Sequence, residues 1–267
     1  MVDSLALYRR LVGAQIRSQL QYRVSFTLDL TGAFLISFLD FLAVLVIFHN
    51  VPHLAGWSVR EVAFLYASSS ISFAATDLAI GHLDLFPQKI RDGTFDVLLV
   101  RPRGTLFQVI SSDFALRRLG KAAQGSVVLV YALSALHIHW SLGRVVVLVA
   151  MIPSGAVVFG AVWVTGACLA FWTTEGGEFT NAFTYGGNFL TQYPIDIYSQ
   201  WARRFLAYFV PMAFVCYFPA LYVLGKPDPL GLPRFLEFLS PVVAVVASAV
   251  AGLVWRVAVR RYRSTGS

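Results

Sequence analysis

Three aspartates stand inside long apolar runs of this sequence, where a charged side chain is costly if the run crosses a bilayer. Asp29 and Asp40 are eleven residues apart, so at ~100° per residue they lie about 20° apart on one face of a helix. Asp77 lies in the next apolar run. A carboxylate at the bilayer centre costs roughly 2.5–3.5 kcal/mol, so these residues should face protein or water. They would line a transport path or relay protons; alternatively, Asp29 and Asp77 reach the interface or pair with arginines such as Arg23.

Few other groups in the sequence are suited to chemistry. His137 and His139 fall in a turn between apolar runs, where a plain interfacial turn is favoured over metal binding. Glu175 and Glu178 have a spacing typical of a solvated helix face. The sequence contains no G-x-x-x-x-G-K-[ST], H-E-x-x-H or G-x-S-x-G motif. We therefore predict no catalytic residue and no metal site, and an intramembrane enzyme is the least favoured class because no acidic or histidine cluster converges at one depth.

The composition is that of a polytopic membrane protein. Of 267 residues 57% are hydrophobic and only 13% are charged, about half the usual charged share of a soluble domain. The net charge of +7 would suggest nucleic acid for a soluble protein, but here the basic residues cluster beside apolar runs. Lipid headgroups and topology explain such clusters, so we expect membrane lipid and no nucleic acid as a partner. Cys168 and Cys216 lie in apolar runs and are expected to be packing residues.

The predicted fold is all-α, with six transmembrane helices. Residues 1–23 are expected to form an amphipathic helix at the membrane interface, or alternatively a helix packed on the rest of the protein. Residues 24–267 form the transmembrane domain. Five spans are predicted directly from apolar runs: Val24–Phe48, Glu61–Phe86, Ala122–Ile138, Val145–Phe171 and Pro241–Val257. The remaining span is either Thr174–Tyr193 or Phe205–Gly225.

The distribution of basic residues predicts the orientation in the membrane. Residues 1–23 carry four Lys or Arg, residues 87–121 carry seven, and the tail from Arg256 carries four, which together are fifteen of the 21 in the chain. The loops at 49–58 and 139–144 hold Trp57, Trp140 and only Arg144 as a basic residue. By the positive-inside rule, we expect a protein of the cell membrane whose termini and residues 87–121 lie on the cytoplasmic side. The richness in Ala, Val and Arg suits a bacterium.

A charged segment, QKIRDGTFDVLLVRPRG at residues 88–104, interrupts the apolar sequence after the second predicted span. It contains the pattern Ile90-x-x-Gly93-x-x-Asp96-x-x-Leu99-x-Arg101-Pro102. In this position the pattern resembles the first cytoplasmic loop of permease subunits of ATP-binding-cassette transporters of the type-2 exporter class. A second matching region reads Y-P-I-D-I-Y at 193–198, F-V-P at 209–211 and Y-F-P-A at 217–220. The resemblance extends over nearly the whole chain.

The resemblance implies that a short coupling helix in the segment 87–121 seats in a groove of a separate ATPase subunit. Glycine permits a tight turn, aspartate favours a helix start, leucines supply an apolar contact, and proline ends the helix. The arginine would pair with acidic residues of the ATPase or with anionic lipid. The residues concerned are Gly93, Asp96, Leu98, Leu99, Arg101 and Pro102. A plain positive-inside loop without a partner is the alternative.

The resemblance also makes Thr174–Tyr193 the fifth span and residues 194–225 an extracellular re-entrant hairpin before the last span. The hairpin would form a gate with residues Tyr193, Pro194, Pro211 and Pro219, the last two marking breaks between short helices. Arg203 and Arg204 would then lie outside, against the positive-inside rule. If they lie inside instead, Phe205–Gly225 is the fifth span and no gate forms.

The function implied by the resemblance is export driven by ATP. This chain would bind no cofactor, and ATP with Mg would be bound by a dimer of partner ATPase subunits. A second permease, identical or homologous, would complete the pathway. The alternative is a secondary transporter driven by protons through Asp40, but that class predicts inverted repeats, which we do not find. The sequence leaves the substrate open among amphiphiles, lipids, glycans and peptides.

Overall fold

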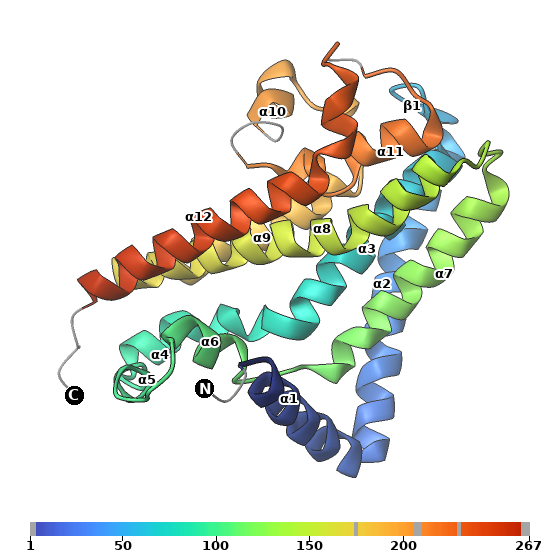
Figure 1. Cartoon of the computed structure of the whole chain (residues 1–267). Helices are drawn as coiled ribbons and strands as arrows, with labels where there is room; N and C mark the ends of the chain where they lie inside the picture. The colour runs from blue at the N-terminus through green and yellow to red at the C-terminus, as the bar shows by residue number, and fades with distance from the viewer. Residues whose placement is uncertain (1–3, 174–175, 206–209, 229–230, 263–267) are drawn as a thin grey trace.

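The computed structural model describes residues 4–173, 176–205, 210–228 and 231–262, and these residues form a bundle of helices (Figure 1). Within them, four helical stretches are long and apolar enough to cross a membrane: Arg23–Asn50, Val59–Arg91, Leu142–Phe171 and Ser240–Arg261. Two shorter helices, α7 (Leu119–Ala135) and α9 (Gly176–Thr191), run in the same bundle. The chain is therefore a mostly helical, multi-pass membrane protein.

The centre of the bundle is formed by α3 (Val59–Ile80) and α8 (Leu142–Ala167). α3 contacts α7 and α8, while α8 also contacts α9 and α12 (Ser240–Arg261). The sequence of α3 is rich in small residues, and its Ser68–Ser70 run is completely buried. Ser72 donates a hydrogen bond to the carbonyl of Ile152 in α8 at 3.0 Å, and Thr76 donates one to Ala156 at 2.6 Å. Small residues let helices approach closely in lipid, and here they fix α3 against α8.

The outermost helix of the bundle is α2 (Arg23–Asn50), which packs mainly on α7. Its buried residues are Ser37, Phe41, Val44 and Phe48, which lie along one stripe, while most of its other side chains are exposed. The contact with α7 is close at Gly120, where a Cβ atom would lie 2.3 Å from the backbone oxygen of Leu30. α2 is therefore held by one narrow face.

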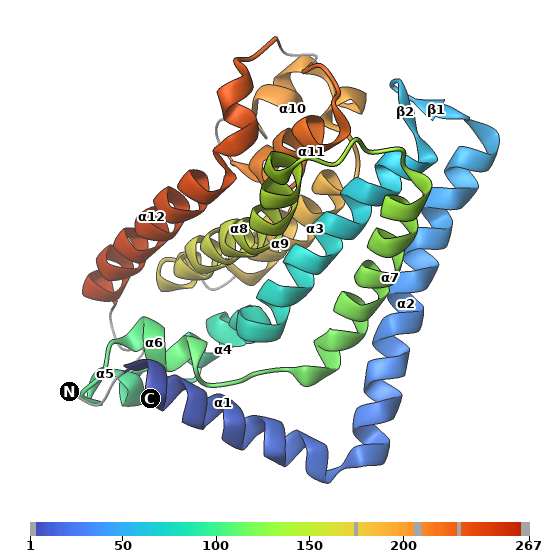
Figure 2. The ribbon, with the colours of Figure 1, turned by 45° about the vertical axis from the view of Figure 1, so that its right-hand side comes forward.

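One end of the bundle, which we call the α1 end, gathers the basic segments. α1 (Ser4–Gln21) lies across this end, steeply inclined to α2 (Figure 2). The chain after α3 continues there through η1 (Gly81–Leu85), α4 (Phe86–Arg91), α5 (Asp96–Leu99), α6 (Thr105–Ile110) and η2 (Leu116–Arg118). The last residues of α12 reach the same end. The described parts of the three basic segments therefore share one end of the molecule.

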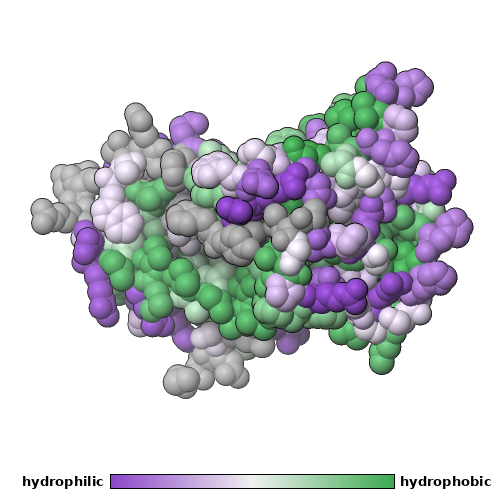
Figure 3. All heavy atoms as spheres, turned by 90° about the horizontal axis from the view of Figure 1, so that it is seen from above, coloured by the Kyte–Doolittle hydropathy of each residue, from purple (hydrophilic) through white to green (hydrophobic). Residues whose placement is uncertain are grey.

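The opposite end, which we call the α11 end, is built from short elements. A two-stranded antiparallel hairpin joins β1 (His53–Leu54) to β2 (Trp57–Ser58), with Leu54 opposite Trp57. The other elements of this end are η4 (Ile195–Ile197), α10 (Gln200–Arg204), η6 (Met212–Phe214), α11 (Tyr217–Leu224) and η7 (Arg234–Phe238). The remaining short element, η3 (Cys168–Phe171), follows α8 at the opposite, α1 end. Viewed onto this end, hydrophilic residues cross the surface and apolar residues flank them (Figure 3).

The five spans predicted directly from apolar runs coincide with helical stretches to within about five residues at each end. The third was expected at Ala122–Ile138, but α7 begins earlier and ends at Ala135, because Leu136 takes an extended conformation with ψ 132°. Of Thr174–Tyr193, the first two residues lie outside the described residues, and α9 covers Gly176–Thr191.

Residues 205–225 do not form one straight helix in the described parts. The chain passes through η6 and a turn before α11 starts at Tyr217. Pro211 precedes η6, as expected of a proline at a break. The expectation that Pro219 also marks a break was wrong, because Pro219 is the third residue of α11. The first turn of a helix has no acceptor for that N–H, so proline is tolerated there.

Candidate functional sites at the two ends of the bundle

The charged segment 88–104 folds into two short helices joined by a glycine turn. α4 ends at Arg91, and Gly93 has φ +66°, a left-handed conformation that glycine adopts without strain. The amide of Gly93 donates to the carbonyl of Ile90, and the amide of Asp96 donates to the carbonyl of Gly93. α5 begins at Asp96 and ends at Leu99. Arg101 and Pro102 follow in an exposed bend.

A buried aromatic side chain, Phe95, anchors this segment to the bundle. Its ring lies 5.5 Å from that of Phe86 in α4 and 5.3 Å from that of Phe171 in η3. It also lies 6.5 Å from Trp255 in α12 and 5.1 Å from Tyr262. Phe95, which immediately precedes α5, therefore contacts the ends of three of the four long helical stretches.

Next to this anchor, α5 presents exposed apolar side chains. Val97, Leu99 and Val100 are 52%, 43% and 84% exposed, and we call these three residues the α5 face. Leu98 is half-buried, and its carbonyl accepts a hydrogen bond at 2.9 Å from Gln108, which also donates to the carbonyl of Arg103. The loop is therefore held to the bundle by Phe95 and its backbone is fixed by Gln108, while the α5 face points away from the bundle. Exposed apolar side chains of this kind are typical of a protein–protein contact surface.

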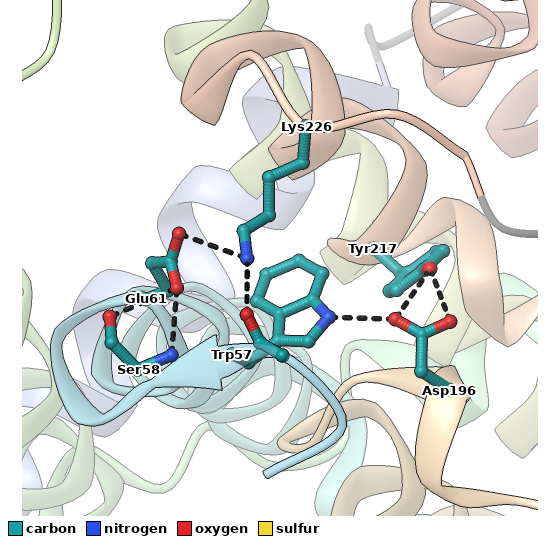
Figure 4. Close-up of polar contacts among 7 residues, drawn as sticks. Trp57, Ser58, Glu61, Asp196, Tyr217 and Lys226 are labelled. Carbon is teal, nitrogen blue, oxygen red and sulfur yellow. Dashed lines mark hydrogen bonds and ion pairs between the residues drawn. The ribbon is translucent and has the colours of Figure 1, made fainter. Parts of the chain in front are cut away.

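At the α11 end, a polar cluster joins the hairpin to the segment after α9 (Figure 4). The indole nitrogen of Trp57 donates to the carboxylate of Asp196 at 2.7 Å. The hydroxyl of Tyr217 donates to the same carboxylate, 3.1 Å from each oxygen. Burial and the negative charge of Asp196 raise the pKa of Tyr217 above its ordinary value, so the phenol stays protonated and remains a donor.

A second set of contacts extends the same cluster towards α3. Glu61 accepts hydrogen bonds from the amide and the hydroxyl of Ser58, at 2.7 and 2.9 Å, in a capping box that starts α3. Lys226 lies 3.1 Å from Glu61, donates to the carbonyl of Gly56, and stands 4.5 Å above the ring of Trp57. The hairpin, α3 and the chain after α11 are thus tied together.

Arg203 has a structural reason to lie at the α11 end. Its Nε donates to the carbonyl of Tyr198 at 2.8 Å, and one terminal nitrogen donates to the carbonyl of Asp196. The side chain also lines a cavity of about 410 Å³ beside the polar cluster. Local hydrogen bonds thus offset the preference of arginine for the side of the membrane that carries the other basic segments.

The four residues expected to form a gate are distributed along the segment after α9. Tyr193 is half-buried, Pro194 and Pro219 are buried, and Pro211 is half-buried. The thiol of Cys216, between the last two prolines, donates to the carbonyl of Thr191 in α9 at 3.0 Å. This contact holds the start of α11 against the bundle and satisfies a backbone carbonyl at the end of α9.

The three aspartates occupy different environments. Asp77 is buried and pairs with Arg118 at 2.9 Å. Asp29 and Asp40 are both exposed on α2. Among the remaining expected groups, His137 and His139 lie in the loop after α7, Glu178 is exposed in α9, and Glu175 lies outside the described residues.

Comparison with known proteins decides the family. A model of the ABC-2 family transporter protein matches residues 34–266. The chain belongs to the ABC-2 transporter family. A search of curated proteins and a search of solved structures each return no match. As an ABC-2 permease, the chain is a transporter component, and members of this family associate with an ABC ATPase.

Two parts of this ABC-2 permease were missed by reasoning from sequence. Phe95 could have been noticed as the lone aromatic residue within the charged segment. The contact of Trp57 with Asp196 spans 139 residues and had no local signal, since a tryptophan in that loop is equally typical of an interfacial belt.

Proposed function

We propose that this chain is the permease subunit of an exporter, coupled to a separate ATPase dimer through the α5 face. The observation that carries the proposal is an exposed apolar surface on a loop that is otherwise charged and firmly anchored. Val100 is the most exposed of its three residues, at 84%. An apolar patch of this kind, rimmed by polar residues, is typical of a protein interface. ATP and Mg would be bound by the partner.

The mechanical path runs through Phe95. Closure of the ATPase dimer on ATP would move α5, and the ring cluster around Phe95 would pass this motion to α4, η3 and α12. Packed aromatic rings shift as a unit because a dense core has discrete arrangements rather than continuous ones. Hydrolysis would then let the loop return.

The topology that fits this role has six spans, with α7 and α9 crossing beside the four longer helical stretches. At ~1.5 Å per residue, the 17 residues of α7 and the 16 of α9 reach about 24–26 Å, a few ångströms short of the ~30 Å hydrocarbon core. Local thinning of the bilayer accommodates a mismatch of this size at modest cost. The α1 end would face the cytoplasm and bind the ATPase. Residues 194–225 would form an extracellular re-entrant hairpin that gates the path, tied to the hairpin β1–β2 by Asp196.

A second permease, identical or homologous, would complete the pathway. Asp40 is exposed near the middle of α2, where contact with hydrocarbon would cost roughly 2.5–3.5 kcal/mol. A second subunit packed beside this face of α2 would remove that cost, because Asp40 would then face a hydrated path between the two subunits instead of hydrocarbon. Transport by the purified chain alone, without ATP and driven by protons, would instead support the secondary transporter.

Site-specific photocrosslinking in cells tests the proposal. A photoreactive residue at Val100 should yield an adduct whose peptides contain the phosphate-binding loop of an ABC ATPase. The matched control is Trp201, which is 73% exposed at the α11 end and should give no such adduct. An ATPase adduct from both positions, or from neither, would contradict coupling through the α5 face.

A further inference from the structure

A small cavity of about 280 Å³ lies where α1 meets α2, just below the roughly 300–1,000 Å³ typical of pockets for drug-sized ligands. Its polar lining comes from Gln19, Tyr22, Ser25, Asp29 and Arg117. Gln19 forms the wall: its amide donates to the carbonyl of Phe114, and its oxygen accepts from the amide of Leu116 at 3.0 Å. The position of the cavity is therefore fixed by contacts of α1 with Phe114 and with the first residue of η2.

The cavity presents two opposite charges that do not neutralise each other. Asp29 and Arg117 are both exposed, and no ion pair links either one to another residue in the described part of the chain. The neighbouring Arg118 is by contrast engaged with Asp77. A ligand with one anionic and one cationic group would satisfy both sides of the cavity at once, with the hydroxyls of Tyr22 and Ser25 as further polar contacts.

The surroundings of the cavity indicate that this ligand has an apolar tail. α2 carries an exposed apolar stripe, formed by Leu28, Leu35 and Leu39 at 68%, 53% and 63% exposure, which begins next to Asp29. α1 lies across the same end of the bundle (Figure 2), as expected for a helix at the level of lipid headgroups. A headgroup in the cavity would thus place its acyl chains along α2.

We propose that this cavity binds a phospholipid whose headgroup carries a phosphate and a primary ammonium. Arg117 would pair with the phosphate, and the carboxylate of Asp29 would accept hydrogen bonds from the ammonium. A trimethylammonium headgroup has no N–H to donate, and a glycerol headgroup has no cation for Asp29. The site therefore selects the primary amine among lipids with the same phosphate, and it does so independently of ATPase coupling.

Native mass spectrometry of the purified full chain tests this selectivity. The chain is mixed with equal amounts of phosphatidylethanolamine, phosphatidylcholine and phosphatidylglycerol with identical acyl chains, and phosphatidylethanolamine should be retained most. Asp29→Asn should lower the ratio of bound phosphatidylethanolamine to phosphatidylglycerol roughly two- to fivefold, the range of an exposed charge contact. Arg117→Gln should lower the retention of all three lipids.

The matched control is Asp113→Asn, since Asp113 is an exposed carboxylate at the same end that accepts only from the adjacent amide of Phe114 among the contacts described. It should leave the lipid ratio unchanged. Equal retention of the three lipids by the unaltered chain, or an unchanged ratio in Asp29→Asn, would overturn the proposal. Displacement of the lipid by an equal concentration of free O-phosphoethanolamine would assign the site to a soluble ligand instead.

Discussion

Trp57 and Asp196 are 139 residues apart in the chain, yet the indole nitrogen of the first donates a hydrogen bond to the carboxylate of the second at 2.7 Å. The side chain of Trp57 is 2% exposed, and the ammonium group of Lys226 lies over its ring. The contact joins the loop between α2 and α3 to the broken segment after α9. If the segment that contains Asp196 moves outward, it must therefore either break this hydrogen bond or move the loop of Trp57 with it.

Trp57→Phe should destabilise the protein by about 1.5–3 kcal/mol, because the carboxylate of Asp196 loses a donor while the aromatic packing is largely kept. The free energy of unfolding in mixed micelles measures this. Asp196→Asn should cost a similar amount, and the double variant should cost less than the sum, since both changes remove one interaction. Trp201→Phe, at a side chain that is 73% exposed, is the control and should stay within about 0.5 kcal/mol. Additive losses would show that the two residues act separately.

Gly120→Ala should force α2 and α7 further apart and lower the free energy of unfolding. The added Cβ would lie 2.3 Å from the carbonyl oxygen of Leu30 and 2.9 Å from the amide of Phe34, and backbone atoms of a helix cannot swing aside. Overpacking of this kind costs typically about 1–3 kcal/mol. Gly252→Ala is the matched control, because no atom lies within 4 Å of its Cβ position and alanine favours helix by roughly 1 kcal/mol. Equal unfolding free energies for the two variants would contradict a tight α2–α7 contact.

Hydropathy predicted the long helices well, because a span of roughly 20 apolar residues is imposed by the bilayer itself. It failed to decide between Thr174–Tyr193 and Phe205–Gly225, since an apolar run has the same mean hydropathy whether its helix is continuous or broken. The polar cluster around Asp196 could not be predicted either, because Trp57, Asp196 and Tyr217 come from three separate segments of the chain. The glycine turn at Gly93, by contrast, depends on a local conformation and could be predicted from its residue type.

Arg118→Met should destabilise the protein by about 3–5 kcal/mol, since it leaves the buried carboxylate of Asp77 without its cation at 2.9 Å. That carboxylate has little room to move: a Cβ on Gly81 would lie 2.0 Å from one of its oxygens. Adding Asp77→Asn to Arg118→Met should restore part of the loss, because the unpaired charge is then gone. Arg256→Gln, at an exposed arginine of α12, should change the unfolding free energy by less than about 0.5 kcal/mol.

Val100→Ser and Phe95→Ala should distinguish the role of the α5 face in contacting the ATPase from the role of Phe95 in anchoring the loop to the bundle. Val100 is 84% exposed, so its change should leave the free energy of unfolding within about 0.5 kcal/mol, while permease-stimulated ATP hydrolysis in the assembled complex falls. Phe95 is fully buried, and Phe95→Ala should cost about 3–5 kcal/mol of folding free energy. If Val100→Ser keeps full stimulation, the α5 face does not contact the ATPase.

Asp40→Asn tests whether the carboxylate on α2 belongs to the transport path. The side chain is exposed and lies on nearly the same helix face as Asp29, about 20° away. Removing the charge should ease membrane insertion, because a carboxylate in hydrocarbon is costly, and should weaken transport if the carboxylate faces a hydrated path between two permeases. The measurements are the amount of inserted protein and the transport phenotype restored to cells that lack the gene. Full transport by a normally inserted Asp40→Asn variant would place Asp40 outside the path and leave its exposure to be explained by a protein contact alone.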